Sequence, residues 1–205
     1  CVAGAFGAAG QNCIGVQRIY VHDAIFEGFR AALLAATAAL RVGDPMDPET
    51  DIGPMVGAAE AERIIAWTVE AVDGGAQLLA GGERAGTLVR PTLLADVADD
   101  ARIACHEAFG PVVCLFRFTN LDDAIDAANR ADYAIHAAIF TESLRTARHA
   151  ARRLRAAGVM INDSTDYRLD AMPFGGAGRG NMGREGVRFA AREMSQTKVI
   201  CFHDA

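Results

Sequence analysis

Cys13 lies in a turn of small residues that suits a nucleophilic thiol. The chain around it reads Phe6-Gly7-Ala8-Ala9-Gly10-Gln11-Asn12-Cys13-Ile14-Gly15-Val16-Gln17-Arg18. Only a thiolate is a good nucleophile, and a backbone without bulky side chains lets a substrate carbonyl approach the sulfur closely. A free cysteine is more often a small core residue, which is how we interpret the other four: Cys1, Cys105, Cys114 and Cys201.

Two further motifs follow Cys13 in order along the chain. The first is Glu107-Ala108-Phe109-Gly110-Pro111, and the second combines Pro173-Phe174-Gly175-Gly176 with Gly183-Arg184-Glu185-Gly186. Together the three motifs resemble the aldehyde dehydrogenase superfamily, whose pattern is G-Q-x-C, then E-x-F-G-P, then P-F-G-G-x-K-x-S-G-x-G-R-E-G. The resemblance covers essentially the whole chain, and three ordered motifs are far more specific than one.

The resemblance implies a role for each matched residue. Cys13 would attack an aldehyde to give a thiohemiacetal, which passes hydride to the nicotinamide of NAD or NADP and leaves a thioester for hydrolysis. Glu107 would bind the nicotinamide ribose hydroxyls, and Phe109 would lie beside the nicotinamide. Phe174 resembles an aromatic residue of the substrate tunnel wall. Without the motifs, Glu107 would be interpreted as a solvent carboxylate and Phe109 as a core aromatic.

Arg168 lies in the stretch 162–168, which in the family lines the substrate tunnel just before P-F-G-G. A guanidinium there could bind a carboxylate, phosphonate or sulfonate with two hydrogen bonds, which would favour a short anionic aldehyde. The alternative is a surface salt bridge to Asp166 or Asp170. The sequence leaves both interpretations open.

The chain departs from the family pattern in two ways. Gly178 stands where the family has Lys, and Gly180-Asn181 stands where it has Ser-Gly, so the loop 173–186 gains backbone freedom and loses a cation. In the family, the cofactor-binding domain, the general-base glutamate and the oxyanion asparagine lie upstream of the nucleophile, and this chain begins just before it. We therefore expect the C-terminal half of the enzyme, with the main NAD or NADP site outside this chain.

Composition narrows the functional class. A net charge of −6 gives no footprint for nucleic acid, and no apolar run approaches the ~20 residues of a membrane span. Five cysteines without C-x-x-C or Cys/His spacing argue against a disulfide framework and against a metal site. We expect a cytoplasmic protein with a small aldehyde as substrate, which forms a homo-oligomer or associates with the missing N-terminal half. The competing hypothesis is a catalytically silent fragment or interaction domain.

Strands and helices alternate along the chain, and they must position the three motifs. Apolar runs predict strands at 19–21, 77–80, 89–97, 112–116, 134–140 and 159–161. Helical periodicity predicts a helix from Asp23 that ends before Gly43, a second around Ile64, one over 120–128 and an Arg-rich helix from Thr141 to Gly158. The alternation predicts an α/β fold with a twisted, mainly parallel sheet and helices on both faces.

The domain organisation follows from this order of elements. We expect a catalytic domain over 1–194, which includes the glycine-rich loop 173–186. The remaining residues, 195–205, should form an oligomerisation strand over Thr197 to Phe202 and a short tail. Such a strand would pair with the sheet of a neighbouring subunit and satisfy its edge N–H and C=O groups.

Overall fold

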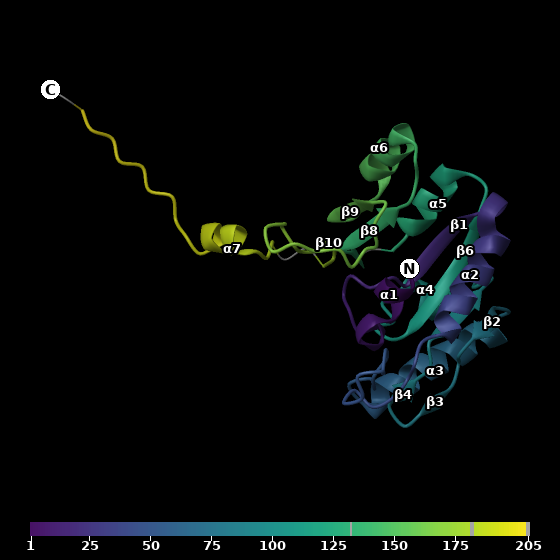
Figure 1. The fold of residues 1–205 in the computed structure, drawn as a ribbon. Coiled ribbons are helices and arrows are strands. Elements are labelled where there is room, and N and C mark those ends of the chain that lie inside the picture. The colour runs from purple at the N-terminus through teal and green to yellow at the C-terminus, as the bar shows by residue number, and fades with distance from the viewer. Residues whose placement is uncertain (132, 181–182, 204–205) are drawn as a thin grey trace.

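The computed structural model describes residues 1–131, 133–180 and 183–203. At its centre lies a four-stranded sheet with the order β1-β6-β5-β2 (Figure 1). Strands β1, β6 and β5 are parallel to one another, whereas β2 runs antiparallel to β5 at the edge. Their bounds are Arg18–His22 for β1, Gln77–Ala80 for β2, Thr92–Ala95 for β5 and Val112–Phe118 for β6. The predicted mainly parallel α/β fold is confirmed.

Helices cover both faces of this sheet. Successive residues of β1 point to opposite faces, so that each face contacts a different helix. Ile19 and Val21 are buried and belong to the same core cluster as Phe26 of helix α2 (Phe26–Ala38). On the opposite face, Arg18 donates to the carbonyl of Ala128 at the end of helix α5 (Leu121–Ala128) over 3.3 Å. Strand β5 is buried along its whole length, as expected for a central strand of a layered α/β fold.

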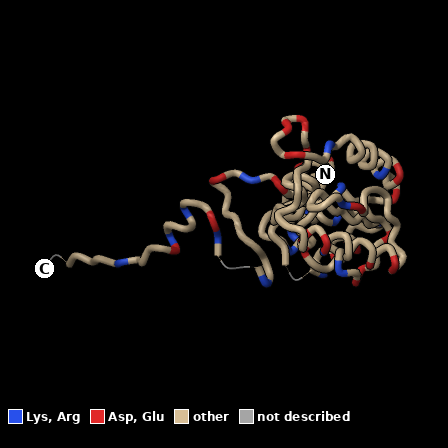
Figure 2. The backbone as a smooth tube through the Cα atoms, turned by 90° about the horizontal axis from the view of Figure 1, so that it is seen from below, with Lys and Arg blue, Asp and Glu red and all other residues tan. Residues whose placement is uncertain are grey.

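Smaller elements complete the body of the molecule. Two-stranded pairs join β3 to β4, β8 to β9, and β7 to β10. The bounds are α1 Val2–Phe6, η1 Gly7–Gly10, η2 Asp23–Ile25, α3 Ala58–Asp73, β3 Arg84–Ala85, β4 Leu88–Val89, α4 Arg102–Cys105, β7 Tyr133–Ala134, β8 His136–Ile139, α6 Leu144–Arg153, β9 Gly158–Ile161, β10 Ala177–Gly178 and α7 Val187–Glu193. Acidic and basic residues are interspersed along the chain (Figure 2).

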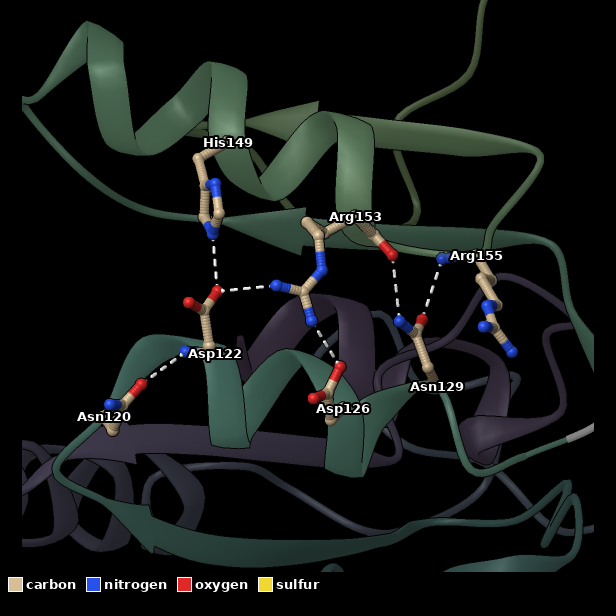
Figure 3. A network of polar contacts seen from close by, with 7 residues as sticks. All are labelled: Asn120, Asp122, Asp126, Asn129, His149, Arg153 and Arg155. Atoms are coloured by element: carbon tan, nitrogen blue, oxygen red, sulfur yellow. Dashed lines mark hydrogen bonds and ion pairs between the residues drawn. The ribbon is translucent and has the colours of Figure 1, made fainter.

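Helix α6 is held against α5 by a network of polar contacts (Figure 3). Asp122 Oδ1 lies 2.5 Å from His149 Nε2 and 3.1 Å from Arg153 Nη1. The second arm of Arg153 reaches Asp126 over 2.6 Å, and Asn129 donates to the Arg153 carbonyl over 2.9 Å. Several charges in one network define a geometry better than an isolated surface pair. The network therefore fixes the layer of β8, β9 and α6 beside the main sheet.

Several element boundaries differ from the sequence prediction. The first long helix begins at Phe26, because a 3-10 turn over Asp23–Ile25 comes before it. The predicted strand 89–97 is interrupted before Thr92, where Pro91 has no backbone N–H to give to a ladder. The predicted strand 134–140 pairs with β9 and lies outside the main sheet. The Arg-rich helix covers only Leu144–Arg153, because Ser143 caps its start.

Within the single chain, residues 197–202 form no strand. The residues after α7 run away from the body of the molecule, and Val199 and Phe202 are 86% and 88% exposed (Figure 1). A strand needs a neighbour for its N–H and C=O groups, and no segment in the described part of the chain pairs with this one. The division into 1–194 and 195–205 stays a prediction.

Candidate active site

The Cys13 thiol is exposed on a tight turn. Before it, Ala8 and Ala9 adopt φ values of 51° and 56°, a left-handed conformation that is uncommon for residues with a Cβ. Asn12 then closes the turn, because its Oδ1 accepts from the N–H of Ile14 over 3.2 Å and its carbonyl accepts from Gly15 over 2.9 Å. Such strained backbone persists only where the surroundings enforce it.

The turn is held against the Glu107 motif by backbone contact. Gly10 has a φ of +67°, and a Cβ built on it would lie 2.1 Å from the carbonyl oxygen of Gly110. Gln11 anchors the other side of the turn, because its Oε1 accepts from the N–H of Val56 over 2.8 Å. The first two motifs, separated by almost a hundred residues in sequence, are therefore packed together through glycine.

Gln17 holds the segment before Glu107 with its side-chain amide. Its Nε2 donates to the carbonyls of Ile103 and His106 over 2.8 and 2.7 Å, and its Oε1 accepts from the N–H of Ala108 over 3.0 Å. Gln17 connects the strand that follows Cys13 to the backbone on either side of Glu107. Sequence reasoning missed this role, since a glutamine beside a strand carries no signal for its distant partners.

Glu107 and Phe109 flank a buried residue and both point outward. Ala108 is 1% exposed whereas Phe109 is 41% exposed, and Phe109 has a φ of 49°. The carbonyl of Ala108 also accepts from Arg63 Nη2 over 2.7 Å. The Glu107 carboxylate and the Phe109 ring are both exposed on this strained loop.

Trp67 supports the same segment from α3. The Arg63 guanidinium lies 4.8 Å from the centroid of its ring, and the Trp67 and His106 ring centroids are 6.2 Å apart. Cation–π contacts of this kind contribute about 0.5 to 1 kcal/mol at exposed sites.

The third motif reaches the Cys13 turn through Thr165. Thr165 Oγ1 donates to the carbonyl of Ile14 over 2.6 Å, and its own carbonyl lies 2.7 Å from His136 Nδ1. The His136 ring in turn meets Phe174 edge to face, with centroids 5.8 Å apart. Phe174 is buried at 7% exposure. Thr165 and His136 therefore link Phe174 to the turn that carries the thiol.

Arg168 lies over Phe174, with its guanidinium carbon 4.0 Å from the ring centroid. Its salt bridge is with Glu185, at 3.6 Å, and not with Asp166 or Asp170, the partners of the alternative that the sequence left open. The reason is local pairing: Glu185 and Phe174 exchange backbone hydrogen bonds of 2.6 and 3.2 Å, which brings Glu185 next to the arginine. At 40% side-chain exposure Arg168 is still open to solvent.

The four cysteines other than Cys13 differ in their exposure to solvent. Cys114 is buried in β6, and burial raises the pKa of its thiol to about 12, although Arg18 opposes that shift. The core interpretation is therefore right for Cys114. It is wrong for Cys1 and Cys201, which are exposed because one begins the chain and the other lies in the extended tail, whereas Cys105 is half-buried.

The glycine at the family's lysine position is explained by the backbone. Gly178 has a φ of +66°, which a lysine would adopt only with strain. Asn181, which replaces the family's glycine, lies outside the described residues. The second departure therefore stays a sequence observation.

Comparison with known proteins matches this arrangement. The Aldehyde dehydrogenase family model covers residues 1–200, and the chain belongs to this family. Members of the family are NAD(P)-dependent oxidoreductases.

Three curated relatives illustrate the similarity. The chain is 52% identical to an aldehyde-dehydrogenase-like protein of Sinorhizobium fredii and 52% identical to aspartate-semialdehyde dehydrogenase 1 of Pseudomonas canavaninivorans. These matches cover 99% of this chain and 40% and 43% of the relatives. A 3-sulfolactaldehyde dehydrogenase of Priestia aryabhattai is 43% identical over 95% of this chain and 41% of its own. The chain therefore spans about two fifths of the length of the curated relatives it matches.

Solved structures show the same fold. Aldehyde dehydrogenase 21 from Physcomitrella patens, in complex with its product succinate, superposes with a TM-score of 0.95 at 37% identity, over 97% of this chain and 41% of that one. Glyceraldehyde-3-phosphate dehydrogenase from Methanocaldococcus jannaschii, complexed with NADP, gives a TM-score of 0.92 at 39% identity, over 95% and 42%.

Proposed function

We propose that this chain supplies the catalytic portion of an NAD(P)-dependent aldehyde dehydrogenase, with Cys13 as its nucleophile. The observation that carries the proposal is the exposed thiol on a strained turn, to which the other two motifs are bound through Gly10 and Thr165. A preorganised turn of this kind holds a nucleophile in one geometry and so lowers the entropic cost of attack.

The chemistry begins at the Cys13 sulfur. The thiolate attacks the aldehyde carbon, so that a C–S bond forms while the carbonyl π electrons move to oxygen and give a thiohemiacetal. Loss of hydride from that carbon restores the C=O bond and leaves a thioester on Cys13. Water then adds to the thioester and the C–S bond breaks, which releases the carboxylate and the thiolate. Backbone N–H groups of the turn are suited to hold the oxyanion.

Glu107 and Phe109 fit the nicotinamide end of a dinucleotide. Two carboxylate oxygens can accept from both hydroxyls of a ribose, and an exposed ring offers an apolar face for a flat heterocycle. The nicotinamide, when bound, would accept the hydride. The remaining contacts to the cofactor would come from outside these 205 residues, which accords with the share of the relatives that the chain spans.

Arg168 favours a short anionic aldehyde. Its guanidinium is only partly engaged by Glu185, and the ring of Phe174 beneath it orients the planar group. Relatives named for aspartate semialdehyde and 3-sulfolactaldehyde, and a neighbour crystallised with its product succinate, support a substrate that carries an anionic group in addition to its aldehyde.

We further propose that the tail over 197–202 pairs with a second subunit.

Mass spectrometry and a complementation assay test the nucleophile. Iodoacetamide should modify Cys13 faster than the other four thiols, and Cys114 should react slowest because burial keeps it protonated. The chain together with the upstream half of a relative should oxidise an aldehyde with NAD or NADP, and Cys13→Ser should abolish this. The competing possibility is a silent interaction fragment. It predicts no aldehyde-dependent NAD(P)H formation when the upstream half is mixed with either the unmodified chain or Cys13→Ser.

A further inference from the structure

A cavity that does not include Cys13 lies on the α5 face of the main sheet. Its volume is about 250 Å³, and among the described residues none of the predicted site residues lines it. The floor is formed by Tyr20 and Phe116, whose rings stack with centroids 5.1 Å apart on neighbouring strands β1 and β6. The walls are formed by the ends of α4 and α5, including Cys105 and Arg130.

The charges in this cavity leave an excess cation. Arg130 is paired with Asp99 over 2.7 Å, so these two largely offset each other. Arg18, in contrast, forms no ion pair with any carboxylate in the described part of the chain. Its guanidinium gives one N–H to the Tyr20 hydroxyl over 3.5 Å and one to the Ala128 carbonyl over 3.3 Å. A guanidinium carries five N–H donors, so three remain available.

Tyr20 adds a hydroxyl group to the cavity, and this hydroxyl can donate a hydrogen bond to an anion. Burial raises the pKa of its hydroxyl, while Arg18 and Arg130 act in the opposite direction. The group therefore stays a neutral O–H donor beside an arginine and above an apolar floor. A half-buried cation without a counter-ion is unfavourable until an anion with hydrogen-bond acceptors joins it.

We propose that this cavity is a binding site for a small oxyanion, a phosphate or carboxylate group, held by Arg18 and the Tyr20 hydroxyl. Occupancy would also act on the catalytic segment. Gln17, next to Arg18, holds the carbonyls of Ile103 and His106, and Cys105 and His106 of the same segment line the cavity. A bound anion would therefore stabilise the backbone that leads to Glu107.

Calorimetric titration of the 205-residue chain with inorganic phosphate tests the proposal, at an ionic strength held constant with sodium chloride. We expect one site per chain, and Arg18→Gln should raise the dissociation constant roughly tenfold or more, as loss of a charge-assisted contact does. Arg188→Gln, which replaces an exposed arginine of α7 outside this cavity and outside the arginine-lined hollow of α6, is the matched control and should leave binding unchanged. A parallel titration with sodium acetate separates a phosphate ligand from a carboxylate.

Alkylation of Cys105 gives a readout that does not depend on a variant's folding. Because Cys105 lines the cavity, saturating phosphate should slow its reaction with neutral iodoacetamide several-fold, while the exposed Cys201 reacts at an unchanged rate. Absence of saturable heat with both anions, together with an unaltered Cys105 rate, would overturn the proposal. Equal weakening by Arg188→Gln and Arg18→Gln would overturn it as well, because it would show a general effect of charge.

Discussion

Gly10 and Gly110 meet backbone to backbone, and a Cβ on Gly10 would lie 2.1 Å from the Gly110 carbonyl oxygen and 2.3 Å from its carbonyl carbon. This contact joins the turn that carries Cys13 to the loop that carries Glu107 and Phe109. The relative placement of thiol and carboxylate therefore depends on a position where no side chain fits.

Substitution of Gly10 by alanine should destabilise the chain strongly. The new Cβ would overlap the backbone of residue 110, and φ of +67° adds strain for any L residue, so we expect a loss of about 2 to 4 kcal/mol. Urea unfolding monitored by circular dichroism measures this. Gly7→Ala is the matched control, because nothing lies within 4 Å of its Cβ and it should change stability by less than about 0.5 kcal/mol. Similar midpoints for the two variants would contradict the packed-turn description.

Gln17→Leu should destabilise the chain by removing all three hydrogen bonds of the amide. The N–H of buried Ala108 would lose its partner, and each unsatisfied buried group costs about 1 to 3 kcal/mol. The same urea experiment applies, with Gln77→Leu, on an exposed edge strand, as control. Hydrogen exchange should also become faster at residues 103–108. Unchanged exchange there would mean that the segment is held without Gln17.

Arg168→Ala should impair anionic aldehydes selectively in the complete enzyme. Loss of a charge-assisted bidentate contact costs about 1.5 to 3 kcal/mol, which is roughly a tenfold to hundredfold decrease in kcat/KM. A neutral aldehyde of similar length is the internal control and should lose little. Equal losses for both aldehydes would assign Arg168 to the structure of the loop through Phe174 and Glu185.

Asp122 should make stability depend on pH in the acidic range. The hydrogen bond from His149, and then the charges of His149 and Arg153, lower the pKa of this carboxyl in the folded chain. A lowered pKa in the folded state stabilises the protein above the unfolded-state pKa, and that contribution is lost as pH falls through the folded-state value. Between pH 5 and pH 3, the urea midpoint should therefore fall less steeply for Asp122→Asn than for the unmodified chain.

The control for this experiment is a neighbouring carboxylate in the same first turn of α5. Asp123 forms no ion pair with any residue that the structure describes, so Asp123→Asn should retain the steep fall. If both variants flatten the profile equally, the effect arises from the helix dipole and not from the contact with α6.

The motifs predicted the family, and the alternation of strands and helices predicted the mainly parallel sheet. This was possible because local composition determines turns and buried strands: Val112 to Leu115 form a continuous apolar run, and they are buried on both faces of β6. The partners that bind the motifs together were not predictable. Gln17, Thr165 and His136 act through contacts with residues far away in sequence, and their types do not specify a partner.

Arg168 also shows that position in the sequence does not identify the partner of a side chain. Proximity in sequence favoured Asp166 and Asp170 as its partners, yet Glu185 is brought beside it by backbone pairing with Phe174. The strand predicted over 197–202 stays a prediction, because its expected partner is a second subunit. Its alternating apolar residues are suitable for pairing, but suitability says nothing about whether the partner lies in the same chain.

Trp67 is the chain's only indole, and its position has a practical consequence. The guanidinium groups of Arg63 and Arg102 lie 4.8 and 5.7 Å from the centroid of its ring, and the His106 imidazole lies beside it. Indole fluorescence is sensitive to nearby charges, so the emission of the unlabelled protein should report directly on the segment that leads to Glu107. Ligand occupancy on either side of that segment can thus be followed optically, without a cofactor and without turnover.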